Sequence, residues 1–396
     1  MRWIAQTAAV MSLNLRTIPA RLGSSSVAVV GIAGVVIVFV SVLSIGAGFA
    51  SAMRGSGSAA RALVMRSGAD SEMTSGLGGP DVDIIKQGPG IRRDGRTLLA
   101  SAELYLILDL PRKNDPDSAS NVPLRGIEPT AMGVRPEVSL IEGRMLEFGT
   151  NEVIVGRGAS HEFADLEVGN TFRSGRNAWH VVGIFEGDGG VAESEVWADA
   201  KAVQGAYQRG NSYQIVLASL DTAASYDTFK DWLTSNPQLN VQIRHENEYY
   251  EEQSRAMTSL ITTIGYGIAV LMGIGAIFGA ILTMYTAVAS RSREIATLRA
   301  LGFNAWSVVV SVLGESLALG ALGGAIGGAA AYVAFNGYRA ATMNWQTFSQ
   351  VAFAFQVTPQ LLVTGLVYAL AMGLVGGLLP AVRAARLPIS SALREL

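Results

Sequence analysis

The residue types that could carry out acid–base or metal chemistry are few in this sequence and lie far apart. The three histidines, His161, His180 and His245, have no spacing that would bring two of them to one metal ion. Cysteine is absent, which excludes disulfides and thiolate chemistry. Asp81 and Asp83 would share one face of a strand, where a solvated sheet edge accounts for them. We therefore expect no catalytic constellation and no metal site.

Nucleotide binding by the chain itself is excluded by its lysines. A phosphate-binding loop requires Gly-Lys followed by Ser or Thr, and none of the four lysines follows a glycine. The glycine-rich stretch GIGAIFG at residues 273–279 lies inside a long apolar run, where close helix packing explains it. The sequence therefore predicts a protein that binds no cofactor directly.

Two sets of carboxylates leave two interpretations open. Residues 246–253, ENEYYEEQ, precede an apolar run and form either a solvated helix face or a segment that docks a partner. Glu315 is the only acid well inside an apolar run, and a carboxylate within a membrane is a functional candidate by default. It also lies only about a dozen residues from a charged loop, where it could cap or pair near the membrane surface.

That charged loop, residues 292–303, reads SREIATLRALGF and is predicted to form a short helix. Ser292 can cap its beginning, Glu294 lies in the first turn and Arg299 lies near the last turn, both favourable to the helix dipole. Gly302 suits the left-handed position just beyond the helix. The segment is therefore a compact charged helix between two apolar runs.

One face of this helix is predicted to be apolar. Ile295, Leu298 and Leu301 recur every three residues, whereas Arg293 and Glu294 project elsewhere. At 1.5 Å per residue, nine residues give a surface about 13 Å long. We expect this surface to dock a partner.

The elements around the loop are membrane spans. The chain is 49% hydrophobic and 16% charged, whereas about a quarter of residues are charged in soluble proteins. Its mean hydropathy is +0.33. A span needs about 20 apolar residues, and the first apolar run is longer than the core of a signal peptide, so we expect a retained anchor. The predicted transmembrane helices are residues 25–52, 257–289, 307–337 and 359–381.

The charges predict the orientation. Between Ser51 and Ala256 lie 29 of the 32 acidic residues and 20 of the 30 basic residues, which leaves 3 acidic and 10 basic residues elsewhere. Nine of those ten bases flank the two termini and the charged loop, and only Arg339 lies between the third and fourth spans. By the positive-inside rule the termini and the loop at residues 290–306 are cytoplasmic. The nine bases are Arg2, Arg16, Arg21, Arg291, Arg293, Arg299, Arg383, Arg386 and Arg394.

Residues 53–256 are predicted to form a large extracytoplasmic α+β domain inserted between the first and second of four transmembrane helices. Residues 51–81 are rich in Gly, Ser and Ala and read as a stalk or linker. Strands are expected at NEVIVGRG, NAWHVVGIFEG, SYQIVLASL and NVQIRHE, and helices at SEVWADAKAVQGAYQ and TAASYDTFKDWLTSN.

The remaining segments are shorter. Residues 1–24 form either an interfacial helix on the cytoplasmic membrane surface or a frayed tail. Residues 338–358 are a short extracytoplasmic loop, and residues 382–396 are a cytoplasmic tail.

Small residues predict tight helix packing in the third span. Gly320, Gly324 and Gly328 form overlapping small-xxx-small repeats, and Gly323 with Gly327 adds a second row. The interface would lie within a bundle or across a dimer. Apart from Glu315 the spans carry no charge, which argues against an ion channel or a proton-driven carrier. The energy must then come from a partner.

Three parts of the sequence resemble the MacB/FtsX-type permeases of ABC transporters. Residues 290–328, SRSREIATLRALGFNAWSVVVSVLGESLALGALGGAIGG, resemble the R-x-R-E-I-x-x-L-R-A-L-G loop and the third span of that family. LLPAVRAARLPISSALREL and PARLGSSSVAVVGIAGVVIV resemble its C-terminal end and the start of its first span. The order of one span, a large outer domain and three spans is also the family's arrangement. The outer domain is similar only in coarse pattern.

The resemblance implies a permease subunit without a fused ATPase domain. It would pair with a second permease, the same chain or a paralogue, and bind a cytoplasmic ABC ATPase dimer that holds ATP and magnesium. The loop would transmit nucleotide-driven movement to the outer domain. The coupling residues would be Arg293, Glu294, Ile295, Leu298, Arg299, Ala300, Leu301 and Gly302.

The resemblance also implies a bacterial inner-membrane protein that exports or extracts a lipid, lipoprotein, peptide or drug. Further partners would be a periplasmic adaptor or carrier and membrane lipids, and no nucleic acid. One alternative is a signalling device that regulates an extracytoplasmic enzyme, as in the cell-division branch of the family. A membrane-anchored enzyme is disfavoured because no catalytic constellation is present.

Overall fold

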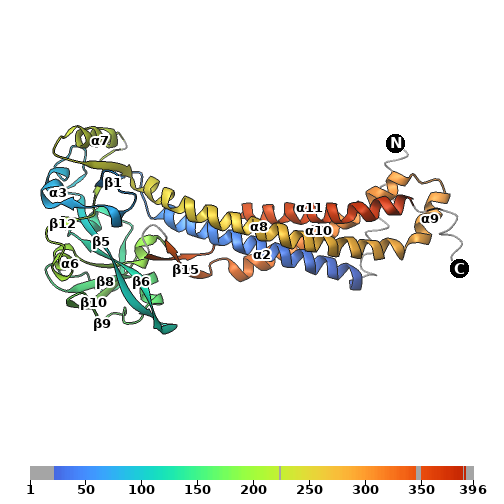
Figure 1. The fold of residues 1–396 in the computed structure, drawn as a ribbon, viewed down its shortest axis with the longest axis horizontal. Coiled ribbons are helices and arrows are strands. Elements are labelled where there is room, and N and C mark those ends of the chain that lie inside the picture. The colour runs from blue at the N-terminus through green and yellow to red at the C-terminus, as the bar shows by residue number, and fades with distance from the viewer. Residues whose placement is uncertain (1–21, 223, 345–348, 387, 389–396) are drawn as a thin grey trace. The chain divides into compact units, whose positions relative to one another are not determined.

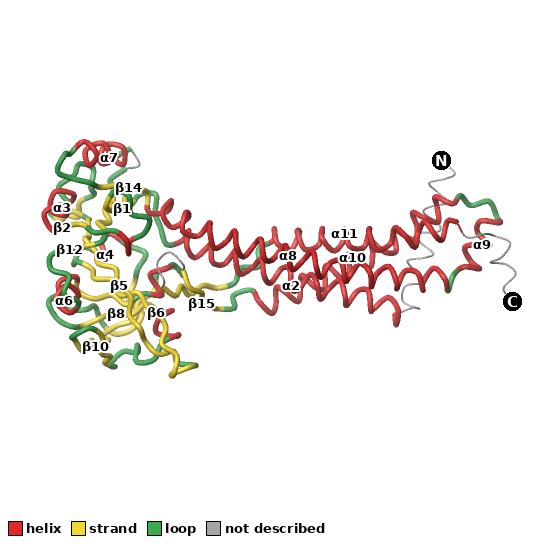
Figure 2. The backbone as a smooth tube through the Cα atoms, in the orientation of Figure 1, coloured by secondary structure: helices red, strands yellow, loops and turns green. Residues whose placement is uncertain are grey.

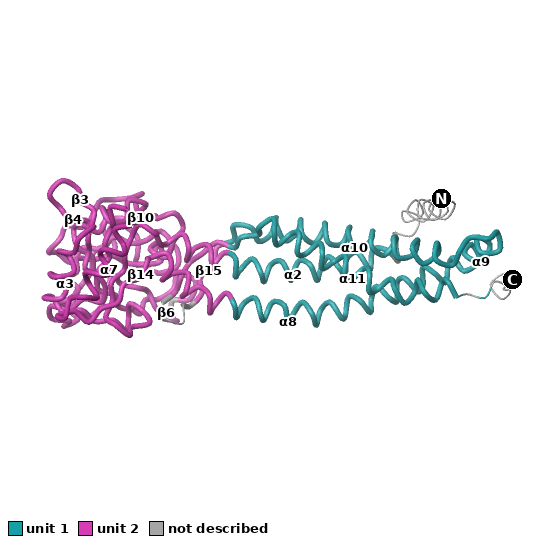
Figure 3. Tube along the Cα trace, turned by 90° about the horizontal axis from the view of Figure 1, so that it is seen from above, with its two compact units in different colours: residues 1–47, 259–338, 355–396 teal, residues 48–258, 339–354 magenta. Residues whose placement is uncertain are grey.

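The computed structural model describes residues 22–222, 224–344, 349–386 and 388, and it divides into two compact units (Figure 1, Figure 3). The helical unit holds the described residues up to Ala47, Ser259–Tyr338 and the described residues from Phe355 onward. The α/β unit holds Gly48–Thr258 and Arg339–Ala354. Residues 1–21 of the predicted interfacial helix and most of the predicted C-terminal tail lie outside the described residues, and residues 22–24 belong to the first long helix.

The helical unit contains long apolar helices that run side by side (Figure 2). Four helices in the described part of the chain are long and apolar enough to cross a membrane. Each of them overlaps one predicted span, and two of them, α2 and α8, extend beyond the predicted bounds into the α/β unit. They are α2 (Leu22–Gly55), α8 (Glu246–Ala289), α10 (Ala305–Phe335) and α11 (Pro359–Arg386), and the short helix α9 (Ser292–Ala300) stands between α8 and α10.

Helix α8 begins well before the predicted second span. It starts at Glu246 rather than at residue 257, so the acidic segment ENEYYEEQ forms its first turns. Acidic side chains are favourable at a helix N-terminus because they face the positive end of the helix dipole. Glu246 and Glu248 both lie in that first turn. The acidic segment and the apolar segment therefore form one continuous helix.

The α/β unit is built on a mixed sheet with the order β14-β1-β13-β5-β6-β11-β8-β10-β7, with β9 paired to β10. Most neighbours are antiparallel, and β10–β8 and β11–β6 are parallel. The strands are β1 (Arg61–Arg66), β5 (Ala100–Arg112), β6 (Asp115–Ile127), β7 (Ser139–Gly143), β8 (Glu152–Gly156), β9 (Thr171–Ser174), β10 (Asn177–Glu186), β11 (Val196–Asp199), β13 (Ile215–Ser219) and β14 (Val241–His245).

Short elements complete the unit. Two small ladders pair β2 with β12 and β3 with β4. These elements are η2 (Glu72–Thr74), β2 (Leu77–Gly78), α3 (Gly79–Ile85), β3 (Arg93–Asp94), β4 (Thr97–Leu98), α4 (Ala131–Val134), α5 (Arg157–Glu162), η3 (Val191–Ser194), α6 (Ala200–Ala206), β12 (Ser212–Tyr213) and α7 (Ser225–Ser235).

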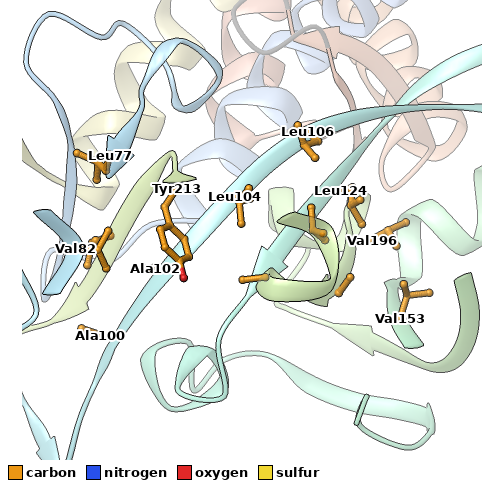
Figure 4. Packing of buried hydrophobic residues seen from close by; sticks show 14 of the residues in the cluster. Leu77, Val82, Ala100, Ala102, Leu104, Leu106, Leu124, Val153, Val196 and Tyr213 are labelled. Carbon is orange, nitrogen blue, oxygen red and sulfur yellow. The ribbon is translucent and has the colours of Figure 1, made fainter. Parts of the chain in front are cut away.

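Alternating apolar residues of the strands form the core of this unit. Leu104 and Leu106 of β5 pack with Leu124 of β6, Val153 of β8 and Val196 of β11 (Figure 4). Strands β8, β10 and β14 were predicted from β-branched runs bounded by Gly and Asn, and helix α7 from helical periodicity that ends at Asn236-Pro237; all four are present. The segment SYQIVLASL splits into β12 and β13.

The predicted stalk at residues 51–81 is wrong. It contains β1, which pairs with β13 on one side and with β14 on the other. Ala62, Leu63, Val64 and Met65 are all buried. Because glycines and serines lie on both sides of this short apolar strand, the composition averaged over residues 51–81 does not indicate a strand.

The predicted strand at Asp81 and Asp83 is also wrong. Both residues lie in helix α3, which begins with Gly79 and Pro80. The Asp81 carboxylate accepts a hydrogen bond from the Gly78 N–H at 3.1 Å. Pro near the first helical position and an acid in the first turn are helix-start signals, which explains the difference.

The segment between the third and fourth spans forms the hairpin β15 (Arg339–Asn344) and β16 (Ser349–Ala354), which belongs to the α/β unit. The Ala352 N–H donates to Ser194 Oγ at 2.8 Å. Phe353 meets Phe49 edge to face, with ring centroids 5.7 Å apart. Strands β15 and β16 are therefore part of the α/β unit, where a loop was predicted.

Candidate functional site

The charged segment between the second and third apolar helices forms helix α9. Gly302 has a φ of +92°, as its predicted left-handed position requires. The Phe303 N–H returns to the Leu298 carbonyl at 3.1 Å and closes the end of the helix. Ser292 does not cap the beginning, because Arg291 occupies the cap position and Ser292 is the first helical residue.

The predicted single apolar face of α9 is wrong. Ile295 is 8% exposed and packs into the bundle core, whereas Leu301 is 73% exposed. Leu298 is intermediate. At about 100° per residue, six residues turn a helix by about 600°, which leaves Ile295 and Leu301 about 120° apart. The inner face is therefore Ile295 with Ala296, and Leu301 belongs to the exposed side.

The exposed side of α9 carries both charge and apolar surface. Most of the predicted coupling residues lie here, and Arg299 is half-buried. Trp306, in the first turn of α10, is 65% exposed and adds a large aromatic side chain close to Leu301 in sequence. A surface with apolar anchors and a polar rim suits docking of a protein partner. Its exposed members are Arg293, Glu294, Thr297, Ala300, Leu301, Gly302 and Trp306.

Glu315 pairs with an arginine of the loop. Arg291 Nη1 donates to Glu315 Oε2 at 3.1 Å, and each side chain is 5% exposed. Of the two interpretations of Glu315, the structure favours pairing. The two residues also line a pocket whose other walls are mainly apolar side chains of α8, α9 and α10.

The two glycine rows of α10 face two different helices. A Cβ on Gly324 would lie 2.7 Å from Ala369 Cβ of α11, and a Cβ on Gly320 would lie 2.9 Å from the Ala369 carbonyl oxygen. A Cβ on Gly327 would lie 2.6 Å from the Ala33 carbonyl oxygen of α2. Gly323 faces α2 and Gly328 faces α11 in the same way. Both rows are thus used inside one chain, which is the bundle alternative of the prediction.

A buried cluster of charges in the α/β unit was missed by sequence reasoning. Arg125 Nη1 contacts Glu72 at 2.7 Å and Glu103 at 2.9 Å, and its Nε contacts Glu195 at 2.7 Å. Arg135 binds the Glu103 carboxylate with both terminal nitrogens, at 2.6 and 2.8 Å. Three carboxylates thus share two guanidinium groups in the interior of the unit. The available signal was that Glu103 and Arg125 each lie beside a leucine of the core, Leu104 and Leu124, in the sequence.

A second ion pair network includes the first residue of α8. Arg61 of β1 pairs with Glu246 and, at 2.7 Å, with Glu137. Arg61 and Glu246 are buried, and Glu246 also accepts from the Ser58 N–H at 2.9 Å. The acidic beginning of α8 is therefore fixed to the sheet of the α/β unit, and the solvated-face interpretation does not hold for Glu246.

Burial controls the ionisation of these carboxylates. It raises the pKa of Glu72, which Arg125 only partly offsets because that guanidinium is shared. It raises the pKa of Glu246 in the same way, against the opposing effect of Arg61. Burial also raises the pKa of Glu103, but the guanidinium groups of Arg135 and Arg125 outweigh this effect, so that the pKa of Glu103 is lowered.

Two of the three histidines contact neighbouring side chains of the α/β unit. The His245 ring stacks on Tyr226 with centroids 3.7 Å apart. His180 Nδ1 lies 2.8 Å from the Thr171 hydroxyl, and His161 lies in helix α5. Among the described residues no three His, Asp or Glu side chains are grouped in a way that could hold a metal ion.

Comparisons with known proteins agree with this arrangement. A family model described as the MacB-like periplasmic core domain matches residues 25–236, and one described as the FtsX-like permease C-terminal matches residues 266–389. No curated protein sequence matches the chain.

Two solved structures are similar to parts of the chain. The periplasmic region of MacB from Actinobacillus actinomycetemcomitans is 14% identical, with a TM-score of 0.38, and the match covers 51% of this chain and 96% of that one. The extracellular domain of the noncanonic ABC-type transporter YknZ from Gram-positive bacteria is 16% identical, with a TM-score of 0.36, and the match covers 46% and 99%. The periplasmic-core family model alone spans more than half of the residues, and with the permease model at the C-terminal end it shows that the chain belongs to the MacB/FtsX family of ABC transporter permeases.

Proposed function

We propose that the chain is the permease subunit of an ABC transporter in which a separate ATPase drives movement of the α/β unit. The observation that carries the proposal is helix α9. Its inner face packs into the bundle through Ile295, while its other side exposes charges together with Leu301. A helix held on one side and exposed on the other suits the receipt of force from a docked protein.

The orientation follows from the basic residues. The termini and α9 would face the cytoplasm and the α/β unit would lie outside the inner membrane of a bacterium. Large apolar side chains are exposed along the four long helices, which lipid would cover. On α8 these include Leu260, Ile264, Val270, Leu271, Ile274, Phe278 and Leu282.

The packing of the bundle bears on the substrate. Helices α10 and α11 approach so closely at Gly320 and Gly324 that a methyl group would clash. Such contact leaves no room for a polar path between these two helices. We therefore infer that the substrate is hydrophobic or amphipathic, such as a lipid, lipoprotein, peptide or drug, and is exported or extracted at the outer side. An adaptor or carrier there would be the natural further partner.

The chain would act with a second permease, since an ATPase dimer has two docking sites. ATP and magnesium would be bound by the ATPase, and hydrolysis would occur there. Because both glycine rows are occupied within the chain, contacts with the second permease would use other faces of the bundle.

Purification of the chain from its native membrane tests this function. We expect an ABC ATPase to co-purify and its ATP hydrolysis to rise when the chain is reconstituted with it in nanodiscs. Absence of any associated ATPase would contradict the proposal. If hydrolysis rises only when an extracytoplasmic enzyme is activated with it, the signalling alternative would hold instead.

A further inference from the structure

We propose that the Arg291–Glu315 ion pair is a positioning joint that fixes α9 to α10, so that a displacement of α9 is passed to the helix bundle. The part that concerns coupling rests on the proposed function. The part that concerns the position of α9 stands on the structure alone. Neither residue is expected to contact the ATPase, because both are buried.

The backbone of Arg291 already belongs to the first turn of α9. Its carbonyl oxygen accepts the Ile295 N–H at 2.9 Å, and it occupies the cap position. Its side chain reaches Glu315 in the third turn of α10. One residue therefore holds the beginning of α9 through its backbone and holds α10 through its side chain.

The mainly apolar surroundings of the ion pair favour one geometry of its two side chains. Besides Glu294 and Ser311, the residues that line the same pocket are apolar, so the pair lies mainly among apolar side chains; they include Met284, Val288, Val308 and Val312. Attraction between opposite charges is stronger in such a medium than in water, and either charge alone would be costly there. The pair thus has a strong preference for one geometry.

Helix α9 needs such a contact. A helix of nine residues is too short to be stable alone. Its buried side chains are Ile295 and Ala296, and apolar contacts are non-directional, so they would allow a short helix to slide or rotate. The ion pair supplies the fixed register that the apolar contact lacks.

The same turn of α10 is also fixed to α11. The Ser316 hydroxyl, next to Glu315, donates to the Gly373 carbonyl. A Cβ on Gly377 would lie 2.6 Å from Ser316 Cβ, so α11 lies directly against this turn. Glu315 and Ser316 therefore connect α10 to α9 on one side and to α11 on the other.

Spin labels test the position of α9 without any partner. The chain has no cysteine, so Thr297→Cys and Leu322→Cys place one label on the exposed side of α9 and one on an exposed position of α10. We expect a narrow distance distribution for the full chain in nanodiscs and a broad one after Glu315→Gln. The charge swap Arg291→Glu with Glu315→Arg should restore the narrow distribution.

Two further variants separate this effect from general damage. Ser316→Ala removes a buried hydrogen bond in the same turn but faces α11, so it should leave the distribution narrow. Arg291→Met with Glu315→Leu leaves no unpaired charge, should fold, and should still broaden the distribution. If the distance distribution stays narrow in Glu315→Gln or in this double variant, the ion pair does not fix the position of α9 and the proposal is wrong.

ATP hydrolysis by the co-purified ATPase tests the coupling part. We expect Glu315→Gln to lower the stimulated rate by at least about fivefold, the lower end of coupling between distant sites. The KM for ATP and the co-purification should stay unchanged, and the charge swap should recover the rate. Full stimulation by Glu315→Gln, together with a broadened label distribution, would overturn the coupling role. If the wild-type chain itself gives no stimulation, the proposed function fails while the labels still decide the joint.

Discussion

At the scale of single residues, the buried carboxylates of the α/β unit are the most unusual feature. Glu72, Glu103 and Glu195 converge on Arg125, and within the described part of the chain Arg135 is the one further guanidinium in an ion pair with any of the three. Three carboxylates and two guanidiniums leave one excess negative charge in an interior that disfavours it. Glu72 is the natural carboxylate to hold a proton, because its partner is shared with both of the others.

This arrangement predicts how stability depends on pH. The pKa of Glu72 is raised by burial from its ordinary value of 4.5, so the folded chain retains a proton that the unfolded chain loses. The stabilisation is complete below about pH 4.5 and is lost as the pH rises through the folded pKa. Glu72→Gln mimics the protonated acid. As the pH rises from about 4.5 to 8, the melting temperature of this variant should therefore fall less than that of the wild type.

The comparison needs a carboxylate without this environment. Glu167→Gln is the control, because Glu167 is exposed and its pKa is lowered by Lys113 rather than raised by burial. Equal pH slopes for the wild type and Glu72→Gln would show that Glu72 is ionised in the folded chain.

Arg125 predicts a large effect of a single substitution. Arg125→Leu leaves Glu72 and Glu195 buried without their guanidinium, and removing one member of a buried ion pair costs about 3–5 kcal/mol. Arg173→Ala, at an exposed position of β9, should change the free energy of unfolding by less than about 0.5 kcal/mol. Denaturant unfolding of the full chain in detergent measures both, and similar losses for the two variants would refute the assignment.

At the scale of elements, the sequence predicted four of the ten strands of the sheet, β8, β10, β13 and β14. The runs of apolar and β-branched residues in β8 and β10 are bounded by Gly and Asn and are visible without any tertiary contact. Strand β1 was missed because its neighbours in sequence are Gly and Ser, while its pairing partners β13 and β14 lie far along the chain.

In helix α9, too, the features set by local sequence were predicted and those set by tertiary contacts were not. Gly302 was predicted because the end of a helix depends on local backbone conformation. The inward face of the helix was not, because Ile295 is buried by side chains of α8 and α10 that no local pattern reveals. The ion pair with Glu315 was for the same reason one of two open interpretations.

The glycine contacts give a prediction for the helix bundle. Gly324→Leu should separate α10 from α11 and lower the melting temperature, because its Cβ has no space beside Ala369. Overpacking of this kind typically costs about 1–3 kcal/mol. Gly275→Leu is the matched control, since a Cβ on Gly275 of α8 meets no atom within 4 Å. Equal melting temperatures for the two variants, measured in the same detergent, would show that α10 and α11 are not in close contact.

At the scale of the whole molecule, the sequence predicted the order of spans and domain but not the extent of the α/β unit. The hairpin of β15 and β16 lies between two spans, yet its Ala352 and Phe353 contact Ser194 and Phe49. Those partners are more than a hundred residues away in sequence, so only the tertiary structure places the hairpin in this unit. Two segments of the chain therefore form the α/β unit: Gly48–Thr258, which runs from the end of α2 to the beginning of α8, and the hairpin segment Arg339–Ala354.

Under the proposed function, a partner ATPase drives this permease through the exposed side of α9. Glu294→Ala with Leu301→Ala removes a charge and an apolar side chain from that side, whereas Leu322→Ala truncates an equally apolar, exposed side chain on α10. The measurement is the ATP hydrolysis of the co-purified ATPase with each variant reconstituted in nanodiscs. We predict that the α9 double variant abolishes stimulation while Leu322→Ala retains it. Full stimulation by the double variant would contradict the account.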